Sequence, residues 1–336
     1  MVTLKDVARE CGVSFSTVSK ALKGSAEISA ETIRLIKEKA SEMGYHPNVA
    51  ARTLRTNRTY DIGVIFEDKT GSGFQHQYFA KIISGLQSVA QREGYEITFT
   101  GSAPGRNFDY YNHIKARNFD GVAVLSADFR RDDICRLVHS EIPSVVLDYV
   151  YDDGHSAVLS DNTSGMTELA EYAVAMGHRR IAMIHGENTL VTAERRKAFL
   201  NVMKRHSINV PGEYFAEGLY NDPITSSDAT EILMSLPEPP TCIFYPDDYS
   251  ALGGIRELNS LGLSPGKDIS IVGYDGILLT SMIIPPLTTY EQNGESIGKL
   301  IGERLISDIE NGAPPERTRR LVTGRLLKGG TVVRLA

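Results

Sequence analysis

The sequence predicts a helical head of about 60 residues followed by two α/β lobes, each with a parallel sheet covered by helices on both faces. Three observations support this. The first 46 residues contain three segments of helical periodicity separated by turn residues. From Asp61 onward, short apolar runs alternate with amphipathic segments, which is typical of βαβ units. The charge also changes, because residues 1–60 hold ten Lys and Arg against six Asp and Glu, a net +4, whereas the whole chain carries −6, which leaves −10 for the rest.

Length and composition narrow the class of protein. A chain of 336 residues is too long for one ordinary core, so several domains are expected. No run of 18 apolar residues occurs, and the charged first 11 residues do not fit a signal peptide. We therefore expect a cytoplasmic protein without a membrane partner. The three cysteines lie far apart without a CxxC pair, which predicts buried free thiols: Cys11, Cys135 and Cys242.

The head, residues 1–46, shows helix signals in a characteristic order. A capping box at Thr3 begins the first helix, and Gly12 ends it. Ser14 can cap a short second helix, and a third helix begins at Ser29 and ends at Gly44. Helix, glycine turn, short helix and third helix form the helix-turn-helix plan of DNA-binding proteins, although a generic three-helix scaffold has the same spacing.

Two segments of the head resemble a known family. TLKDVARECGVSFSTVSKAL and then GYHPNVAARTLRTNRT are similar to the DNA-binding head and hinge of the lactose-repressor (LacI/GalR) family. Both motifs stand in the right order and spacing, and the likeness continues along the whole chain. The resemblance implies that the second helix reads bases through Phe15, Ser16 and Lys20. It implies phosphate contacts through Ser14, Thr17 and Ser19.

Residues 47–60 are expected to form a hinge helix and linker. The segment Asn48–Arg55 is too short for a stable helix in water, because marginal length is about 12–15 residues. We expect it to order only when two copies pack together on DNA, with Asn48 as its cap and Ala51 allowing close approach. The resemblance implies that Leu54 wedges into the minor groove at the operator centre.

Residues 61–336 are expected to bind an effector and to dimerise. The resemblance implies a type I periplasmic-binding-protein-like fold for the two lobes. The expected partition is about 61–161 and 290–320 for the first lobe, and 162–289 and 321–336 for the second. The chain would cross between lobes near Asp161, near Leu287–Asn293 and near Arg320.

Ligands of such sheets bind beyond the carboxyl ends of the strands, so the residues that follow each strand are candidates. Carboxylates, one arginine and aromatic faces suit a polyhydroxylated ring. The resemblance places effector contacts at Arg195 and Asp275 above all. The full set of expected effector-binding residues is Tyr78, Phe79, Asp148, Arg195, Asp247 and Asp275. Asp248 is expected to cap a helix instead.

The sequence therefore predicts a dimeric transcription regulator, with repressor as the first reading, that binds a pseudo-palindromic operator and responds to a sugar or sugar derivative. A purine or nucleoside effector is the alternative. The sequence does not decide whether the effector acts as an inducer or as a corepressor. We find no nucleophile elbow, phosphate loop or metal cluster, so we expect no enzyme, catalytic residue, metal or cofactor. A sugar-binding transport protein is the remaining alternative, but it would need a signal peptide where the helix-turn-helix stands. No leucine-heptad tail is found, which favours a homodimer over a tetramer.

Overall fold

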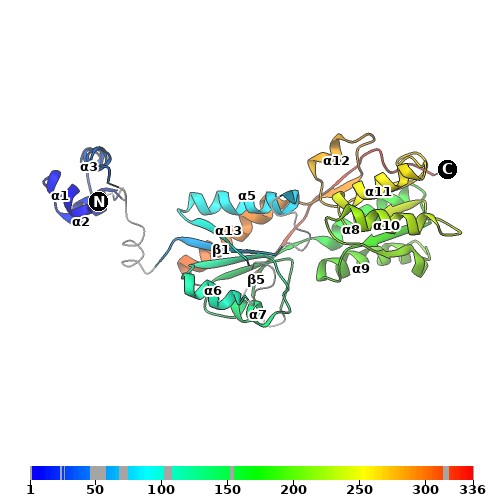
Figure 1. Ribbon diagram of the computed structural model, residues 1–336, viewed down its shortest axis with the longest axis horizontal. Coiled ribbons are helices and arrows are strands. Elements are labelled where there is room, and N and C mark those ends of the chain that lie inside the picture. The colour runs from blue at the N-terminus through cyan, green and yellow to red at the C-terminus, as the bar shows by residue number, and fades with distance from the viewer. Residues whose placement is uncertain are drawn as a thin grey trace. The chain divides into compact units, whose positions relative to one another are not determined.

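The structure, a computed structural model, describes residues 2–22, 25, 27–45, 58–67, 75–101, 108–151, 155–312 and 318–335. Its internal contacts divide the chain into two compact units, Met1–Tyr60 and Asp61–Ala336. The division falls at the residue where the sequence pattern changes from helical segments to alternating strands and helices. Figure 1 shows the helical unit and the larger α/β unit.

The first unit contains three helices, α1 (Leu4–Glu10), α2 (Phe15–Leu22) and α3 (Ala30–Glu42). The capping box predicted at Thr3 is present, because its hydroxyl accepts from the Asp6 amide and the Asp6 carboxylate accepts from the Thr3 amide. The turn between α1 and α2 needs a residue in the left-handed region, and Gly12 has a φ of 65° there. The buried side chains of the three helices meet in one small core: Val7, Ala8, Val18, Ala21, Ile36 and Ala40.

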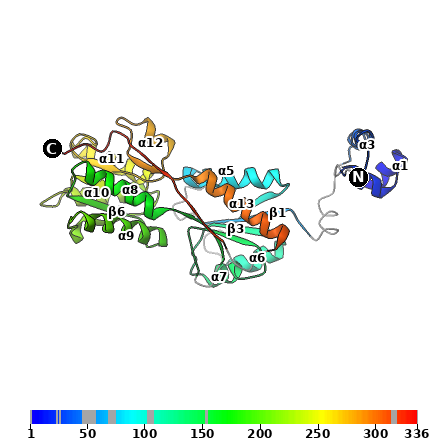
Figure 2. The ribbon, with the colours of Figure 1, turned by 180° about the vertical axis from the view of Figure 1, so that it is seen from behind.

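The first lobe of the second unit is a parallel six-stranded sheet in the order β11-β5-β4-β3-β1-β2. Helices α5 and α13 cover one face and α6 and α7 cover the other (Figures 1 and 2). Both faces are therefore apolar, and the inner strands are buried almost throughout. The elements are β1 (Asp61–Phe66), α5 (Gln77–Arg92), β2 (Glu96–Thr100), α6 (Tyr110–Arg117), β3 (Gly121–Ser126), α7 (Asp132–Val138), β4 (Ser144–Leu147), β5 (Ser156–Ser160), α13 (Gly294–Asn311) and β11 (Arg319–Val322).

Helices α5 and α13 pack closely because a glycine of each helix faces the backbone of the other helix. A Cβ atom at Gly85 would collide with the carbonyl oxygen of Glu295, and one at Gly298 would collide with that of Ile82. This contact fixes α5 against the sheet, and the first turn of α5 carries Tyr78 and Phe79.

The second lobe has a parallel four-stranded sheet in the order β7-β6-β8-β9. Successive side chains of a strand point to opposite faces, so Ile181 and Met183 of β6 pack with α8 and α9, whereas Ala182 and Ile184 pack with α10 and α11. The elements are α8 (Asn162–Ala175), β6 (Ile181–His185), α9 (Leu190–Arg205), a 3₁₀ turn (Gly212–Tyr214), β7 (Phe215–Glu217), α10 (Pro223–Met234), β8 (Cys242–Phe244), α11 (Asp248–Ser260), β9 (Ser270–Val272) and α12 (Leu278–Met282).

Three segments connect the lobes. The chain passes from β5 to α8 at Asp161, and from β10 (Thr289–Glu291) to α13 at Gln292–Asn293. The third crossing differs from the expected position near Arg320. Leu321 and Val322 still pair with β5 in the first lobe, so the crossing lies between β11 and β12 (Arg325–Leu327), which pairs antiparallel with β10.

The expectation of three buried thiols is wrong for two of them. All three cysteines are free, and Cys242 is buried because it lies on an inner strand of the second sheet. Cys11 caps the end of α1 and Cys135 lies on the outer helix α7, so both are only half-buried. Among the described residues, no helix is both long and apolar enough to cross a bilayer.

Candidate functional site

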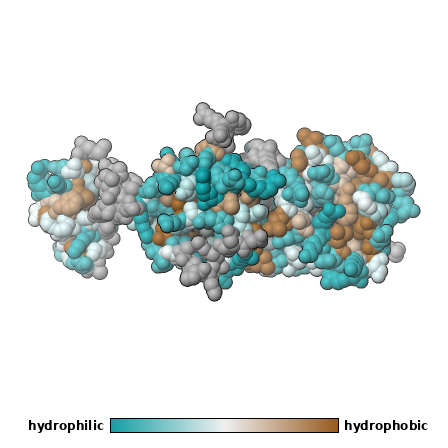
Figure 3. Space-filling view, turned by 90° about the horizontal axis from the view of Figure 1, so that it is seen from below, coloured by the Kyte–Doolittle hydropathy of each residue, from teal (hydrophilic) through white to brown (hydrophobic). Residues whose placement is uncertain are grey.

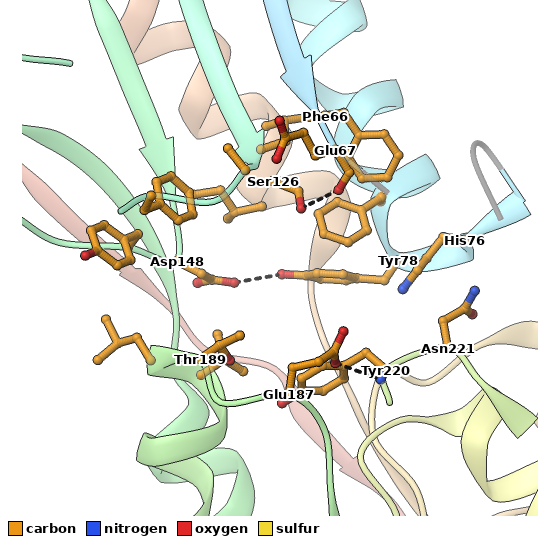
Figure 4. Close-up of a pocket in the computed structure, with 18 of the residues that line it drawn as sticks. Phe66, Glu67, His76, Tyr78, Ser126, Asp148, Glu187, Thr189, Tyr220 and Asn221 are labelled. Atoms are coloured by element: carbon orange, nitrogen blue, oxygen red, sulfur yellow. Dashed lines mark hydrogen bonds between the residues drawn. The ribbon is translucent and has the colours of Figure 1, made fainter. Parts of the chain in front are cut away.

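A cavity of about 250 Å³ lies between the two lobes of the second unit (Figure 4). Many of its lining residues lie at or just beyond the carboxyl ends of strands, as expected for doubly wound sheets. Phe66, Ser126 and Leu147 end β1, β3 and β4 of the first lobe. In the second lobe, Glu187 lies two residues beyond β6 and Asp275 three residues beyond β9. Both sheets therefore present the carboxyl ends of their strands to one cavity.

Among the described residues that line this cavity, Arg195 is the one with a guanidinium or ammonium group. Neighbouring residues hold its side chain in place. It lies on α9 and is buried, with a relative exposure of 6%. Its Nε donates to Asn162 Oδ1 at 2.8 Å, and Nη1 donates to the Pro246 carbonyl at 3.0 Å. Its guanidinium carbon lies 3.5 Å from the centroid of the Tyr274 ring. Burial alone would lower the pKa of Arg195, but Tyr274, Tyr220 and Asp275 raise it, so the group stays charged. No described residue accepts a hydrogen bond from Nη2.

Asp275 supplies a carboxylate from the second lobe. Its φ of 113° is unusual for a residue with a side chain, and such strain persists only where the surroundings enforce it. Its Oδ1 accepts from Gln292 Nε2 at 2.6 Å. Burial and the nearby Asp247 raise the pKa of Asp275 well above its ordinary value, and Arg195 partly offsets this. A ligand hydroxyl that donates to Asp275 would replace some of the lost hydration.

Asp148 and Tyr78 hold each other in the first lobe. Asp148 accepts from the Ser160 amide at 2.5 Å and from the Ser160 hydroxyl at 2.9 Å. The Tyr78 hydroxyl lies 2.9 Å from Ser160 Oγ and donates to Asp148 Oδ2 at 3.4 Å, the contact dashed in Figure 4. Burial raises the pKa of both groups. The Asp148 carboxylate oxygens are thus already hydrogen-bonded within the protein. The contact between Asp148 and Tyr78 holds the Tyr78 ring at the cavity.

Asp247 differs from its expected role, because it does not line the cavity. It caps α11 by accepting from the Ser250 amide at 2.8 Å, and it accepts from the Asn221 amide at 2.6 Å. Its carboxylate is therefore occupied behind the cavity wall, where it positions Asn221, which does line the cavity.

Asp248 also departs from its expected role as a helix cap, because Asp247 caps α11 instead. It is completely buried and accepts from the Ile277 amide, the Thr280 hydroxyl and the Thr289 hydroxyl at 2.6–3.1 Å. Asp247 thus takes the capping role expected of Asp248. Asp248 does not take the cavity-lining role expected of Asp247, because neither acid lines the cavity.

Five of the six expected effector-binding residues line the cavity, and several lining residues were not expected. Among these are Phe129, Tyr149, Glu187, Tyr220, Asn221 and Gln292. Most of them follow strand ends, so the rule that selected Asp148 and Asp275 could have selected them. Glu67 and His76, which follow the first strand and so were candidates under the strand-end rule, also line the cavity. Tyr220, Phe129 and Tyr149 add ring faces to those of Tyr78 and Phe79.

In the first unit, the residues expected to contact DNA lie on and before α2. Ser14 Oγ accepts from the Thr17 amide at 3.1 Å and so caps the helix, with Ser16 Oγ 2.7 Å away. Phe15 is 48% exposed although it is aromatic. Lys20 Nζ lies 2.5 Å from Glu27 Oε2. Ser19 is half-buried on the same helix. Asn48, Ala51 and Leu54 lie outside the described residues.

Two parts of the chain match described families. Residues 3–48 match bacterial regulatory proteins of the lacI family, and residues 170–332 match a periplasmic binding protein-like domain. The first match covers all three helices of the head, and the second covers most of the second lobe together with α13.

Relatives are similar over nearly the whole length. The chain is 34% identical over 312 residues to the probable HTH-type transcriptional repressor ExuR of Bacillus subtilis, covering 92% of each protein. It is 30% identical to the HTH-type transcriptional repressor PurR of Pasteurella multocida, covering 98% of this chain and 99% of PurR. Among solved structures, the Lac repressor dimer bound to operator and the anti-inducer ONPF has a TM-score of 0.84 at 25% identity and 99% coverage of both chains.

Proposed function

Since the chain belongs to the lacI family of bacterial regulatory proteins, we propose that it is a repressor whose operator affinity changes when a sugar binds between its lobes. As a member of this family it is a DNA-binding transcription regulator that acts as a dimer. The identity of the effector and the residues that contact it are the proposed part.

The observation that supports a sugar is that charged groups and aromatic rings line the cavity together. The second lobe contributes polar groups, among them Glu187, Arg195 and Asp275. The first lobe contributes rings, among them Phe79 and Tyr78. A pyranose has hydroxyl edges that pair with carboxylates and a guanidinium, and a C–H face that packs on aromatic rings. The lining of the cavity offers partners for both kinds of surface.

A purine or nucleoside is the second candidate, and the similarity to PurR favours it. Rings such as Phe79 and Tyr220 offer stacking faces to a base. The carboxyl groups favour the sugar, because the oxygens of Glu187 and Asp275 accept hydrogen bonds and vicinal hydroxyls supply several donors.

For DNA, we propose that Phe15, Ser16 and Lys20 contact bases and that Ser14, Thr17 and Ser19 contact phosphates. The hydroxyls at the start of α2 support this, because a helix N-terminus with exposed hydroxyls suits anionic oxygens. The net charge of +4 on residues 1–60 attracts the operator, and the net charge of −10 on the remainder keeps that part off DNA.

The coupling between effector and operator is proposed to pass through the hinge. Asn48, Ala51 and Leu54 would order with the partner's hinge in the minor groove. An effector that favours one arrangement of the lobes by a few kcal/mol changes operator occupancy substantially, because each 1.4 kcal/mol is a factor of ten.

A thermal-shift screen of the full chain with neutral sugars and with nucleobases and nucleosides tests the proposal. A ligand present at 100 times its Kd stabilises the folded state by about 2.7 kcal/mol. We expect at least one neutral sugar to raise Tm and to change operator affinity in a gel shift. Stabilisation by nucleobases or nucleosides alone would replace the sugar with the second candidate.

A further inference from the structure

The cavity has a polar part, to which the proposed sugar is assigned, and an apolar end for which the proposed function gives no role. In Figure 4, His76 and Asn221 lie at one side, whereas Asp148 and Thr189 lie at the opposite side. The chain continues from Asp148 to Tyr149 and from Thr189 to Leu190, and both of these residues also line the cavity.

An aromatic pair forms the first-lobe wall of this end. The rings of Phe129 and Tyr149 stack with centroids 4.4 Å apart and planes 9° apart. Both rings line the cavity and both are only half-buried. Leu190 and Val191, in the first turn of α9, line the same cavity from the second lobe, and Leu190 is 38% exposed. None of these four side chains carries a charge.

The aromatic pair is held rigidly. Tyr151 packs edge-on against Tyr149, with centroids 4.8 Å apart and planes at 69°, and its hydroxyl donates to the Phe129 carbonyl at 2.7 Å. The Tyr151 amide in turn donates to His155 Nε2 at 2.8 Å. A platform fixed in this way loses little conformational freedom when a ligand ring packs on it, so it is suited to binding.

We infer that the effector has two linked rings: a polyhydroxylated ring among Arg195, Asp275 and Tyr78, and a second ring between the Phe129–Tyr149 pair and Leu190–Val191. The effector class is a glycoside whose second ring presents an apolar face, either the C–H face of another pyranose or an aryl group. The inference rests on the proposed function, because the first ring is taken to be a sugar. A single-ring sugar would leave the apolar end in contact with water, whereas a second ring would cover it and gain that burial.

Calorimetric titration of the full chain with matched pairs tests the inference. The pairs are cellobiose and glucose, lactose and galactose, and p-nitrophenyl β-glucoside and methyl β-glucoside. We expect at least one two-ring ligand to bind about tenfold or more tightly than its one-ring counterpart. The disaccharide pairs and the aryl pair distinguish the two sources of the second ring.

Variants test whether a higher affinity for two-ring ligands comes from the apolar end of the cavity. Phe129→Ala and Leu190→Ala are each expected to reduce the two-ring advantage to about threefold or less, because two-ring affinity falls more than one-ring affinity. Leu190 lies at the start of a helix and is partly exposed, so its truncation tests the inference even where Phe129→Ala perturbs folding. Tyr111→Ala is the matched control, because Tyr111 is a half-buried ring of the first lobe that does not line the cavity.

Equal affinity for one-ring and two-ring members of every pair would overturn the inference and leave a sugar effector in place. An advantage that survives both Phe129→Ala and Leu190→Ala would also overturn it, because the second ring would then bind elsewhere. Binding of nucleosides with no binding of any sugar would overturn the proposed function and this inference together.

Discussion

Arg195 lies face-on over the ring of Tyr274, with its guanidinium carbon 3.5 Å from the ring centroid. The ring covers one face of a buried cation, while Asn162 and the Pro246 carbonyl fix its edge. Arg195 is thereby oriented before any ligand arrives, which lowers the cost of binding. This arrangement requires the planar guanidinium, since an ammonium group makes neither the stack nor the two directed bonds in the same way.

Arg195→Lys and Arg195→Ala are therefore both expected to abolish the effector response while operator binding persists. The head is a separate compact unit, so its folding and its own DNA contacts do not require the Arg195 side chain. Calorimetric titration measures the first property and a gel shift without effector measures the second. Arg196→Ala is the control, because Arg196 packs on the Phe215 ring and does not line the cavity. An unchanged effector titration in both Arg195 variants would refute the assignment.

Asp248 is expected to make stability depend on pH. Burial raises the pKa of Asp248 to about 7, although its three hydrogen-bond donors lower it in part. In the unfolded chain an aspartate has a pKa of about 3.9, so the folded state binds this proton more tightly. Its contribution to the free energy of unfolding is complete below about pH 4 and is lost as the pH rises to about 7.

Asp248→Asn removes this dependence. Relative to wild type, the free energy of unfolding of the variant should rise by as much as about 4 kcal/mol between about pH 4 and pH 7, since one pKa unit corresponds to 1.36 kcal/mol. Urea unfolding of the α/β unit within the full chain, followed at several pH values, measures the difference. Glu213→Gln alters an exposed carboxylate and should track wild type. Parallel curves for wild type and Asp248→Asn would contradict the prediction.

Lys20 is expected to read a base. Its ammonium group lies 2.5 Å from Glu27, and its side chain is half-exposed, so DNA can replace this exposed ion pair at small cost. Lys20→Ala should lower specific operator affinity by about 1–3 kcal/mol and relax preference at one base pair in each half-site. Gel shifts on the operator, on single-base variants and on random DNA measure this. Equal weakening on every sequence would show a phosphate contact instead.

The homodimer is expected to form through the second lobe. Among the described residues, most of the large exposed apolar side chains lie on that lobe. The face of the lobe drawn in Figure 3, which is seen from below and not from the side of α12, also carries apolar patches. Around α12, Leu278, Met282 and Ile284 are 62%, 66% and 97% exposed, a clustering that marks an interaction surface. Ile284→Asp should raise the Kd of the dimer about tenfold or more in analytical ultracentrifugation. Leu200→Asp, on α9, is the control, and equal dimerisation of the two variants would exclude this surface.

The hinge is expected to order only on operator. A helix confined to residues 48–55 is too short to be stable alone. Backbone amides 49–55 should exchange rapidly in the free protein and become protected in the operator complex, and Leu54→Ala should lose operator affinity and DNA bending while it binds effector normally. Hydrogen exchange with and without operator measures the first expectation. Protection of these amides in the free dimer would mean that the switch lies elsewhere.

The sequence by itself determined the order of elements, because local signals mark each of them. The capping box at Thr3, the glycine at position 12 and the apolar runs after Asp61 depend only on near neighbours along the chain. The strand-end rule also found Asp148 and Asp275, since the carboxyl ends of parallel strands share one edge. Arg195 was found differently, through the family resemblance, because it lies inside a helix.

Only the tertiary structure decided how neighbouring residues divide their tasks. Asp247 and Asp248 follow the same strand, yet one caps α11 and the other is buried against Thr280 and Thr289, and neither lines the cavity. The aromatic end of the cavity likewise brings together Phe129 and Tyr149, which follow two different strands, and Leu190 of the other lobe. Such placements depend on which distant groups satisfy each carboxylate and cover each ring, and spacing along the chain does not carry that information.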